Sequence, residues 1–324
     1  MTSPRSHTPD IFVSPVAARL MGSERILLAG AGGGFDVFAG VPLFLALRGA
    51  GKQVHLANLS FTYLAGTDAA RLGESLWRVD HTTSGEARYF PEMYLARWLN
   101  DASIPSDVYC FDKVGIRPLR AAYAHLVEAL DIDTIILIDG GTDILMRGDE
   151  AGLGTPAEDM ASLAAVSKLE VTTKLVSCLG FGIDAFHGVC HAHFLENVAA
   201  LERVGGYLGA HSIHLSMPEV RMFRDIVEYT HARMPQRESI VNGSIVSAVE
   251  GQFGNFQRTE RTQNSELFIN PLMSMYWHFE LEALAKQSLY LESLEGTDTI
   301  FDVQLRIEAF RNSTKTRPRT TIPC

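Results

Sequence analysis

Short runs of valine, isoleucine and leucine alternate with helix-like segments along the first two-thirds of the chain, and this alternation limits the fold more than any other feature. The runs are nearly continuous, which is typical of strands covered on both faces. We predict six strands: Arg25–Gly30, Gln53–Leu59, Asp107–Phe111, Thr134–Asp139, Lys174–Phe181 and Tyr207–Leu215. Strands that alternate with helices make right-handed crossovers, so the sequence predicts a doubly wound, mostly parallel, Rossmann-like α/β sheet.

The pattern changes near residue 216. From Met217 onward the segments are mostly of helical type, notably MYWHFELEALAKQSLYLESL at residues 275–294. The last residues are polar, basic and proline-containing, which is typical of a solvated tail. We therefore divide the chain into an N-terminal extension (1–21), a Rossmann-like core (22–216), a helical lobe packed on the core (217–312) and a flexible tail (313–324).

Composition narrows the kinds of partner that we expect. The net charge of −10 argues against nucleic acid and anionic membranes, which attract basic surfaces. The first residues lack an apolar signal segment, and no apolar run is long enough to span a bilayer. The four cysteines are widely spaced, as in proteins with reduced thiols. We expect a cytoplasmic protein with a small-molecule ligand, either monomeric or a homo-oligomer.

Polar segments follow the ends of several predicted strands. Ligands of open α/β sheets bind beyond the carboxyl ends of the strands, near the point where the strand order reverses. Glycine-rich or charged segments occupy this position at residues 30–40, 60–67, 112–115, 139–150 and 182–193. We expect these segments to converge on one edge of the sheet and to form the binding site there.

The segment AGAGGGFD, residues 29–36, resembles the opening of a dinucleotide-binding loop. A full G-x-G-x-x-G pattern would place a third glycine at Phe35. The end of the second strand also lacks the acidic residue that binds a ribose and offers only Asn58 and Ser60, which we expect to contact a ligand. A nicotinamide dinucleotide is therefore disfavoured.

The same glycine loop has two interpretations. In the first, Gly32, Gly33 and Gly34 present backbone amides to a ligand, and Asp36 binds sugar hydroxyls or a cation. In the second, the glycines form only a tight turn and Asp36 caps the next helix.

The most informative segment is LIDGGTDILMRGDE, residues 137–150, where Asp139, Asp143, Asp149 and Glu150 follow a buried strand with Arg147 as the local counter-charge. Carboxylates this close repel one another unless a cation or a proton intervenes. One interpretation is a Mg²⁺ or Ca²⁺ site with Asp139 and Asp143 as ligands. A second is acid–base catalysis by Asp143, Asp149 or Glu150. A third is a solvated loop in which aspartates cap a short helix.

The next helix starts near Thr155. Thr155 and Glu158 stand at the spacing of a capping box, and Asp159 follows in the first helical turn, where acidic residues are favoured. These roles explain Glu158 and Asp159 without a ligand, so we do not assign either of them to the site.

Histidines and a cysteine follow the fifth strand in GIDAFHGVCHAHF, residues 182–194. If a helix starts near His187, then His187, Cys190 and His191 share one face. This arrangement indicates a zinc site, with His187 among the ligands, or a Cys190 nucleophile activated by a neighbouring histidine such as His193. The alternative is that these residues only begin a helix.

A polar connection in the helical lobe, RTERTQNSELFINP at residues 258–271, contains Arg258, Arg261, Thr262 and Asn264. If it covers the site as a lid, Arg261 binds an anionic group of the ligand. An ordinary surface loop has the same composition.

Three segments together resemble domain-of-unknown-function family 1152 of bacteria and archaea. They are AGAGGGFDVFAGVPLFLALRGAGKQVHLANLSF, IDGGTDILMRGDEAGLGTPAEDMASLAAV and GSIVSAVEGQFGNF. The resemblance extends over about residues 22–311 and implies a Rossmann-like core. It places the glycine loop and the DGGTD…GDE segment among the family hallmarks, but it supplies no catalytic residues.

The sequence favours an enzyme that acts on a small polar or anionic metabolite, such as a nucleoside or sugar phosphate. The chemistry expected is hydrolysis or elimination by carboxylates, assisted by Mg²⁺, Ca²⁺ or Zn²⁺ if a cation is bound. The alternative is a non-catalytic binding or sensor protein that uses the same glycine and aspartate edge.

Overall fold

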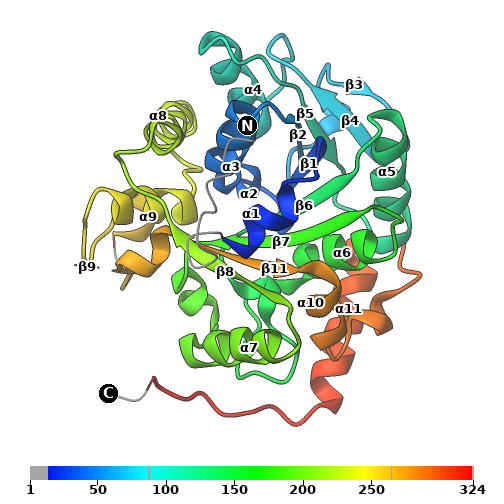
Figure 1. The fold of residues 1–324 in the computed structure, drawn as a ribbon, viewed down its shortest axis with the longest axis vertical. Coiled ribbons are helices and arrows are strands. Elements are labelled where there is room, and N and C mark those ends of the chain that lie inside the picture. Colours follow the sequence, from blue (N-terminus) through cyan, green and yellow to red (C-terminus); the bar gives the residue numbers. More distant parts are fainter. Residues whose placement is uncertain (1–13, 87, 264, 323–324) are drawn as a thin grey trace, which may run out of the picture.

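The computed structural model describes residues 14–86, 88–263 and 265–322. Most of the expected N-terminal extension (residues 1–13), Asn264 and Cys324 lie outside this described part. Within it the chain forms a mostly parallel sheet with helices on both faces (Figure 1), which confirms the predicted Rossmann-like α/β class.

The central sheet has nine strands in the order β3-β4-β5-β2-β1-β6-β7-β11-β8. All of the predicted strands are present. Their bounds are β1 Arg25–Gly30, β2 Gln53–Leu59, β5 Val108–Phe111, β6 Thr134–Gly140, β7 Thr173–Leu179 and β8 Tyr207–Ser212. The sequence analysis did not find β3 (Ala70–Arg71), β4 (Leu76–Val79) or β11 (Met275–Glu280).

The parallel part of the sheet is β5-β2-β1-β6-β7, in which each pair of neighbours is parallel. From β1 the chain builds outward to β2 and β5 on one side, and then returns to add β6 and β7 on the other. The strand order therefore reverses between β1 and β6. The carboxyl ends of these two strands mark the place where a ligand site is expected.

Strand β11 lies between β7 and β8 and is antiparallel to both. The prediction of a helix across MYWHFELEALAKQSLYLESL is therefore wrong for its first six residues. This segment is rich in aromatic residues, which favour strands, and Tyr276–Phe279 are all buried. Helical residues begin only at Leu281, in α10 (Leu281–Gln287).

Helices cover both faces because alternate strand residues point to opposite sides. Leu27 and Ala29 of β1 belong to one apolar cluster, and Ile26 and Leu28 belong to the other. The first face packs against α5 (Ile116–Ala129), α6 (Pro156–Ser167), α7 (His191–Arg203), α10 and α11 (Ile300–Ser313). The second packs against α1 (Pro15–Leu20), α2 (Asp36–Ala39), α3 (Val41–Gly49), α4 (Pro91–Asp101), α8 (Pro218–Arg233) and α9 (Ile240–Val249).

A two-stranded ribbon, β9 (Gly254–Asn255) with β10 (Phe268–Ile269), follows α9. The C-terminal residues after α11 are mostly exposed, as predicted for a solvated tail, but two of them contact the rest of the protein. The backbone N–H of Arg317 donates to the carbonyl of Asp149 at 2.7 Å, and the carbonyl of Thr320 accepts from the Cys190 thiol. No helix among the described residues is both long enough and apolar enough to cross a membrane.

Candidate active site

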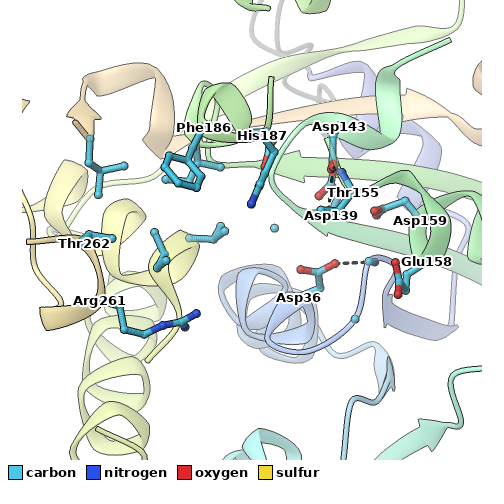
Figure 2. A pocket seen from close by; sticks show the side chains of 18 of the residues that line it. Asp36, Asp139, Asp143, Thr155, Glu158, Asp159, Phe186, His187, Arg261 and Thr262 are labelled. Atoms are coloured by element: carbon cyan, nitrogen blue, oxygen red, sulfur yellow. Dashed lines mark hydrogen bonds between the residues drawn. The ribbon is translucent and has the colours of Figure 1, made fainter. Parts of the chain in front are cut away.

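A cavity of about 580 Å³ lies at the carboxyl ends of β1 and β6, where the strand order reverses. Its size is typical of small-molecule sites. Acidic side chains line one side, and Phe186, His187 and Arg261 line the other (Figure 2). The acidic residues that line the cavity are Asp36, Asp139, Asp143, Glu158, Asp159, Asp184 and, in the predicted lid segment, Glu266. Four of the five polar segments predicted to converge at this edge therefore line the cavity, whereas residues 112–115 do not.

In the glycine loop, the backbone N–H of Gly32 binds the side chain of Asp36. The N–H of Gly32 donates to Oδ2 of Asp36 at 2.6 Å, so Asp36 does not cap α2. A Cβ atom on residue 32 would lie 2.8 Å from oxygens of both Asp36 and Asp159, so a larger residue would displace these carboxylates. Burial raises the pKa of Asp36 to about 8, against the effect of the Gly32 hydrogen bond.

Of the remaining loop residues, Gly33 lines the cavity and Gly34 lines a neighbouring hollow. The two other predicted ligand contacts, Asn58 and Ser60, are buried behind the loop and do not line the cavity. Asn58 donates to the carbonyl of Gly34 and to Glu92, both at 2.8 Å. Asn58 therefore holds the glycine loop in place.

Two further aspartates come from β6 and the 3₁₀ helix that follows it (Asp143–Leu145), as the sequence predicts. Asp139 accepts the N–H of Ile144 at 3.2 Å, and Asp143 accepts the N–H of Thr155 at 2.7 Å. Burial raises the pKa of both carboxyls; at Asp139 the neighbouring Asp143 adds to the effect. A cation or protons must therefore compensate the charge of this pair.

Two further cavity aspartates, Asp159 and Asp184, are not among the site residues predicted from the sequence. Asp184 follows β7 and accepts the N–H of Thr142 at 2.6 Å. Oδ1 of Asp159 is buried and has no hydrogen-bond partner among the described residues. Burial is the main cause that raises the pKa of both carboxyls well above the ordinary value, and repulsion from Asp143 is the second. Asp159 is thus the carboxylate with the least internal compensation.

The predicted capping box at the start of α6 is absent, since the Thr155 side chain makes no capping hydrogen bond. Thr155 instead donates to Asp143, and Glu158 pairs with Lys113 at 2.5 Å. The first turn of α6 consequently presents Glu158 and Asp159 to the cavity. Their helix-start position gave a sufficient local explanation, which is why they were set aside.

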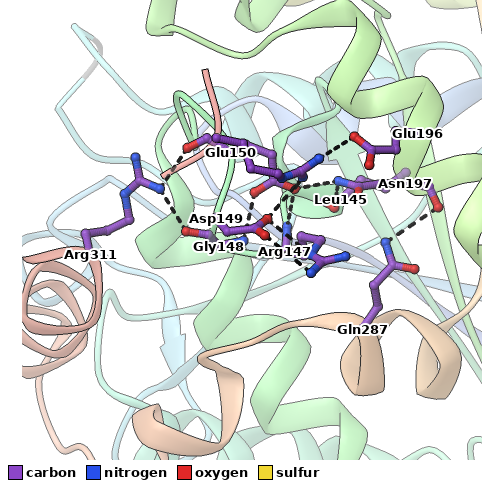
Figure 3. A network of polar contacts seen from close by, with 10 residues as sticks. Leu145, Arg147, Gly148, Asp149, Glu150, Glu196, Asn197, Gln287 and Arg311 are labelled. Atoms are coloured by element: carbon purple, nitrogen blue, oxygen red, sulfur yellow. Dashed lines mark hydrogen bonds and ion pairs between the residues drawn. The ribbon is translucent and has the colours of Figure 1, made fainter. Parts of the chain in front are cut away.

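Asp149 and Glu150 lie outside the cavity lining, in a network of polar contacts on the other side of the loop (Figure 3). Glu150 is fully buried and accepts from the N–H groups of Arg147 and Gly148 and from the Asn197 side chain. Asp149 pairs with Arg147 and with Arg317 of the C-terminal segment. Their contacts indicate that they hold the loop and do not face a ligand.

The histidine and cysteine residues are dispersed. Helix α7 begins at His191, so His187, Cys190 and His191 do not share a helical face and that prediction is wrong. Only His187 lines the cavity. Cys190 donates to the carbonyl of Thr320 at 2.9 Å, and the ring of His191 packs 5.2 Å from that of Phe181.

The lid segment is partly as predicted. Arg261 and Thr262 line the cavity, and Nη1 of Arg261 donates to the carbonyl of Glu238 at 2.6 Å. Arg258 instead pairs with Glu228 and Glu250 at the surface.

One group of carboxylates has the geometry of a cation site. Asp36, Asp139 and Asp159 each offer one oxygen, and these oxygens lie within 4.8 Å of one another. Of the three predicted metal ligands, this group includes Asp139 but neither Asp143 nor His187. Oxygens at this spacing suit Mg²⁺ or Ca²⁺, which bind carboxylates at about 2.0–2.6 Å.

Comparisons with known proteins identify a family without an assigned activity. No curated protein gives a significant match. A family model described as a protein of unknown function, DUF1152, matches residues 61–316. The matched region contains Asp139, Asp143, Asp159 and Asp184 and begins after the glycine loop. Because the match covers most of the chain, we conclude that the protein belongs to the DUF1152 family.

Proposed function

We propose that the protein is a divalent-cation-dependent hydrolase of a small polar metabolite. The observation that carries this proposal is the group formed by Asp36, Asp139 and Asp159, whose oxygens lie within 4.8 Å of one another in a cavity. Oδ1 of Asp159, buried and without a partner among the described residues, supplies an open ligand position. Oxygen-only ligands favour Mg²⁺, Mn²⁺ or Ca²⁺ over Zn²⁺.

Charge balance supports a cation. Of the described residues that line the cavity, only His187 and Arg261 are basic, against seven carboxylates. Lys113 contacts one of these, Glu158, at 2.5 Å. Without a cation the others must take up protons, in keeping with the raised pKa of Asp36 and Asp139. A divalent cation would allow these carboxylates to ionise together.

The remaining side chains suit hydrolysis. A bound cation lowers the pKa of a coordinated water and orients the substrate. We propose that Asp143, held by Thr155, accepts the proton of the attacking water, whose oxygen bonds to the electrophilic atom of the substrate. The bond from that atom to the leaving group breaks, and His187, on the opposite side of the cavity (Figure 2), donates a proton to the leaving group.

The cysteines support a proposed cytoplasmic location. Cys110, Cys178 and Cys190 are free and buried, which suits a reducing compartment.

The direct test is cation binding by chelator-treated protein. Mn²⁺, as a spectroscopic substitute for Mg²⁺, should bind at one site per chain, and Asp159→Asn should lower the affinity at least about tenfold. Asp101→Asn, at the exposed end of α4, is the matched control and should have no effect. Equal Mn²⁺ affinity of the wild-type protein and Asp159→Asn would contradict the site.

Turnover is tested with a panel of nucleosides, nucleotides and sugar phosphates, followed by mass spectrometry of the products. We expect one class to be hydrolysed in the presence of Mg²⁺ or Mn²⁺, and Asp143→Asn to abolish the reaction while ligand binding persists. Binding of a panel member without any product would favour the non-catalytic sensor instead.

A further inference from the structure

A second hollow of about 620 Å³ adjoins the candidate active site. It differs from the first in its charge, because Arg237 and Arg261 line it together with the start of helix α9. The two hollows have seven lining residues in common: Gly33, Asp36, Phe61, His187, Ile240, Val241 and Arg261. They are therefore two ends of one depression: the first has a large excess of carboxylates, whereas in the second two arginines, Arg237 and Arg261, stand against two carboxylates, Asp36 and Glu238.

The N-terminus of α9 faces the second hollow. Ser239 is the N-cap, and its Oγ accepts the N–H of Asn242 at 3.1 Å. The two preceding residues, Ile240 and Val241, line the hollow, and their N–H groups have no acceptor among the described residues. Free N–H groups at the start of a ten-residue helix carry a partial positive charge that favours an anion.

Side chains at the same place point to a ligand independently of the helix. The Asn242 side chain is 1% exposed. Its Nδ2 donates to the carbonyl of Phe35 and to Oγ of Ser239, which fixes the orientation of the amide. Its Oδ1 has no donor among the described residues. Because Asn242 also lines the hollow, this oxygen offers an acceptor to a hydroxyl or N–H of a bound molecule.

The arginines supply the charge. Neither Arg237 nor Arg261 forms an ion pair with a carboxylate of the described part of the chain. Arg261 donates one hydrogen bond, from its guanidinium to the carbonyl of Glu238. The Arg261 guanidinium points toward the space between Asp36 and His187 (Figure 2). Two guanidinium groups beside a helix N-terminus form a common arrangement for binding a phosphate.

We infer that the substrate is a phosphorylated metabolite, whose phosphate binds between Arg237, Arg261 and the N-terminus of α9. This inference rests on the proposed function, because it assigns the bond that is hydrolysed to the aspartate end of the same depression. Phe61 lines both hollows and is 46% exposed, so it contacts the part of the substrate that connects the two ends. Oδ1 of Asn242 accepts a hydroxyl of that part.

Inorganic phosphate is the probe for this subsite. Isothermal titration of chelator-treated protein with phosphate should show binding, and the double variant Arg237→Gln/Arg261→Gln should weaken it at least about tenfold. Arg203→Gln, in the last turn of α7 and away from the cavity, is the matched control and should bind phosphate as the wild-type protein does. Absence of phosphate binding to the wild-type protein, or equal binding by the double variant, would overturn the inference.

Mn²⁺ titrations of the same variants separate this inference from the proposed function. The double arginine variant should retain the Mn²⁺ affinity of the wild-type protein. Asp159→Asn should bind Mn²⁺ more weakly but keep the phosphate affinity of the wild-type protein. If phosphate binds as described but Mn²⁺ does not bind, the proposed function fails and the anion subsite stands. If Mn²⁺ binds and phosphate does not, the subsite fails alone.

Discussion

Replacing Asp36 with asparagine is expected to stabilise the protein when no cation is bound. The folded state raises the pKa of Asp36 from 3.8 to about 8, mainly through burial. Between these two values the folded state holds a proton that the unfolded state has lost. The free energy of unfolding therefore falls as the pH rises from about 4 to about 8, and this contribution is fully present only below pH 4.

The size of the effect follows from the difference in pKa. About four pH units correspond to about 6 kcal/mol at 1.36 kcal/mol per unit. The Asp36 side chain is partly exposed to the cavity, so water screens the charge and we expect about 2–3 kcal/mol. Asparagine keeps an oxygen for the Gly32 N–H but has no charge to bury. It also lacks the second carboxylate oxygen, so cation binding should be lost.

Urea denaturation of chelator-treated protein at about pH 5.5 and about pH 8.5 measures this effect. The free energy of unfolding of the wild-type protein should fall toward the higher pH. For Asp36→Asn this fall should be about 2 kcal/mol smaller. Excess Mg²⁺ at the higher pH should restore the wild-type protein only. Asp101→Asn, exposed at the end of α4, should follow the wild-type protein throughout. A wild-type stability that is flat or rises with pH would refute the reasoning.

Three further substitutions test the roles of the surrounding residues. Gly154→Ala would place a Cβ atom against the Asp143 carboxylate, at a backbone φ of +73°. It should therefore lower the free energy of unfolding by about 2 kcal/mol, measured by urea denaturation, and weaken Mn²⁺ binding. Gly49→Ala, with open space around it, should change neither the stability nor the Mn²⁺ affinity. Glu150→Gln should cost about 2 kcal/mol in the same assay while leaving Mn²⁺ affinity unchanged, and an altered affinity would return Glu150 to the site. Cys190→Ala should keep Mn²⁺ affinity and turnover within about twofold, since the thiol does not line the cavity; a large loss of turnover would implicate the thiol in the reaction.

The parallel strands were predictable because their sequences carry the evidence locally. A fully buried strand needs apolar residues on both faces, and β1 and β2 match the predicted bounds. The position of β11 was not predictable in this way, because an antiparallel insertion between β7 and β8 depends on pairing between distant segments. No local pattern in residues 275–280 records which neighbours they will have.

The site was predictable where a residue lies at or near the end of a strand. Asp139, at the end of β6, and Asp36 and Asp143, within a few residues of the ends of β1 and β6, were found for this reason, since the fold brings strand ends together. Asp159 was missed because its position at a helix start already had a local explanation. Glu150 was selected because it is close to Asp143 in sequence, yet its contacts with Asn197 and Arg317 come from far along the chain. Proximity in sequence did not imply a common orientation.

The placement of β11 also has a consequence for the order in which the protein is synthesised. Among the described residues, strand β8 pairs only with β11 in the sheet, and β7 has β11 as one of its two neighbours. Residues 213–274 must leave the ribosome before that neighbour emerges, which takes several seconds at ordinary rates of translation. During this interval one edge of β7 is open beside a largely assembled parallel sheet. An open, apolar strand edge invites pairing with other chains, so nascent chains paused before residue 275 are the species most exposed to aggregation.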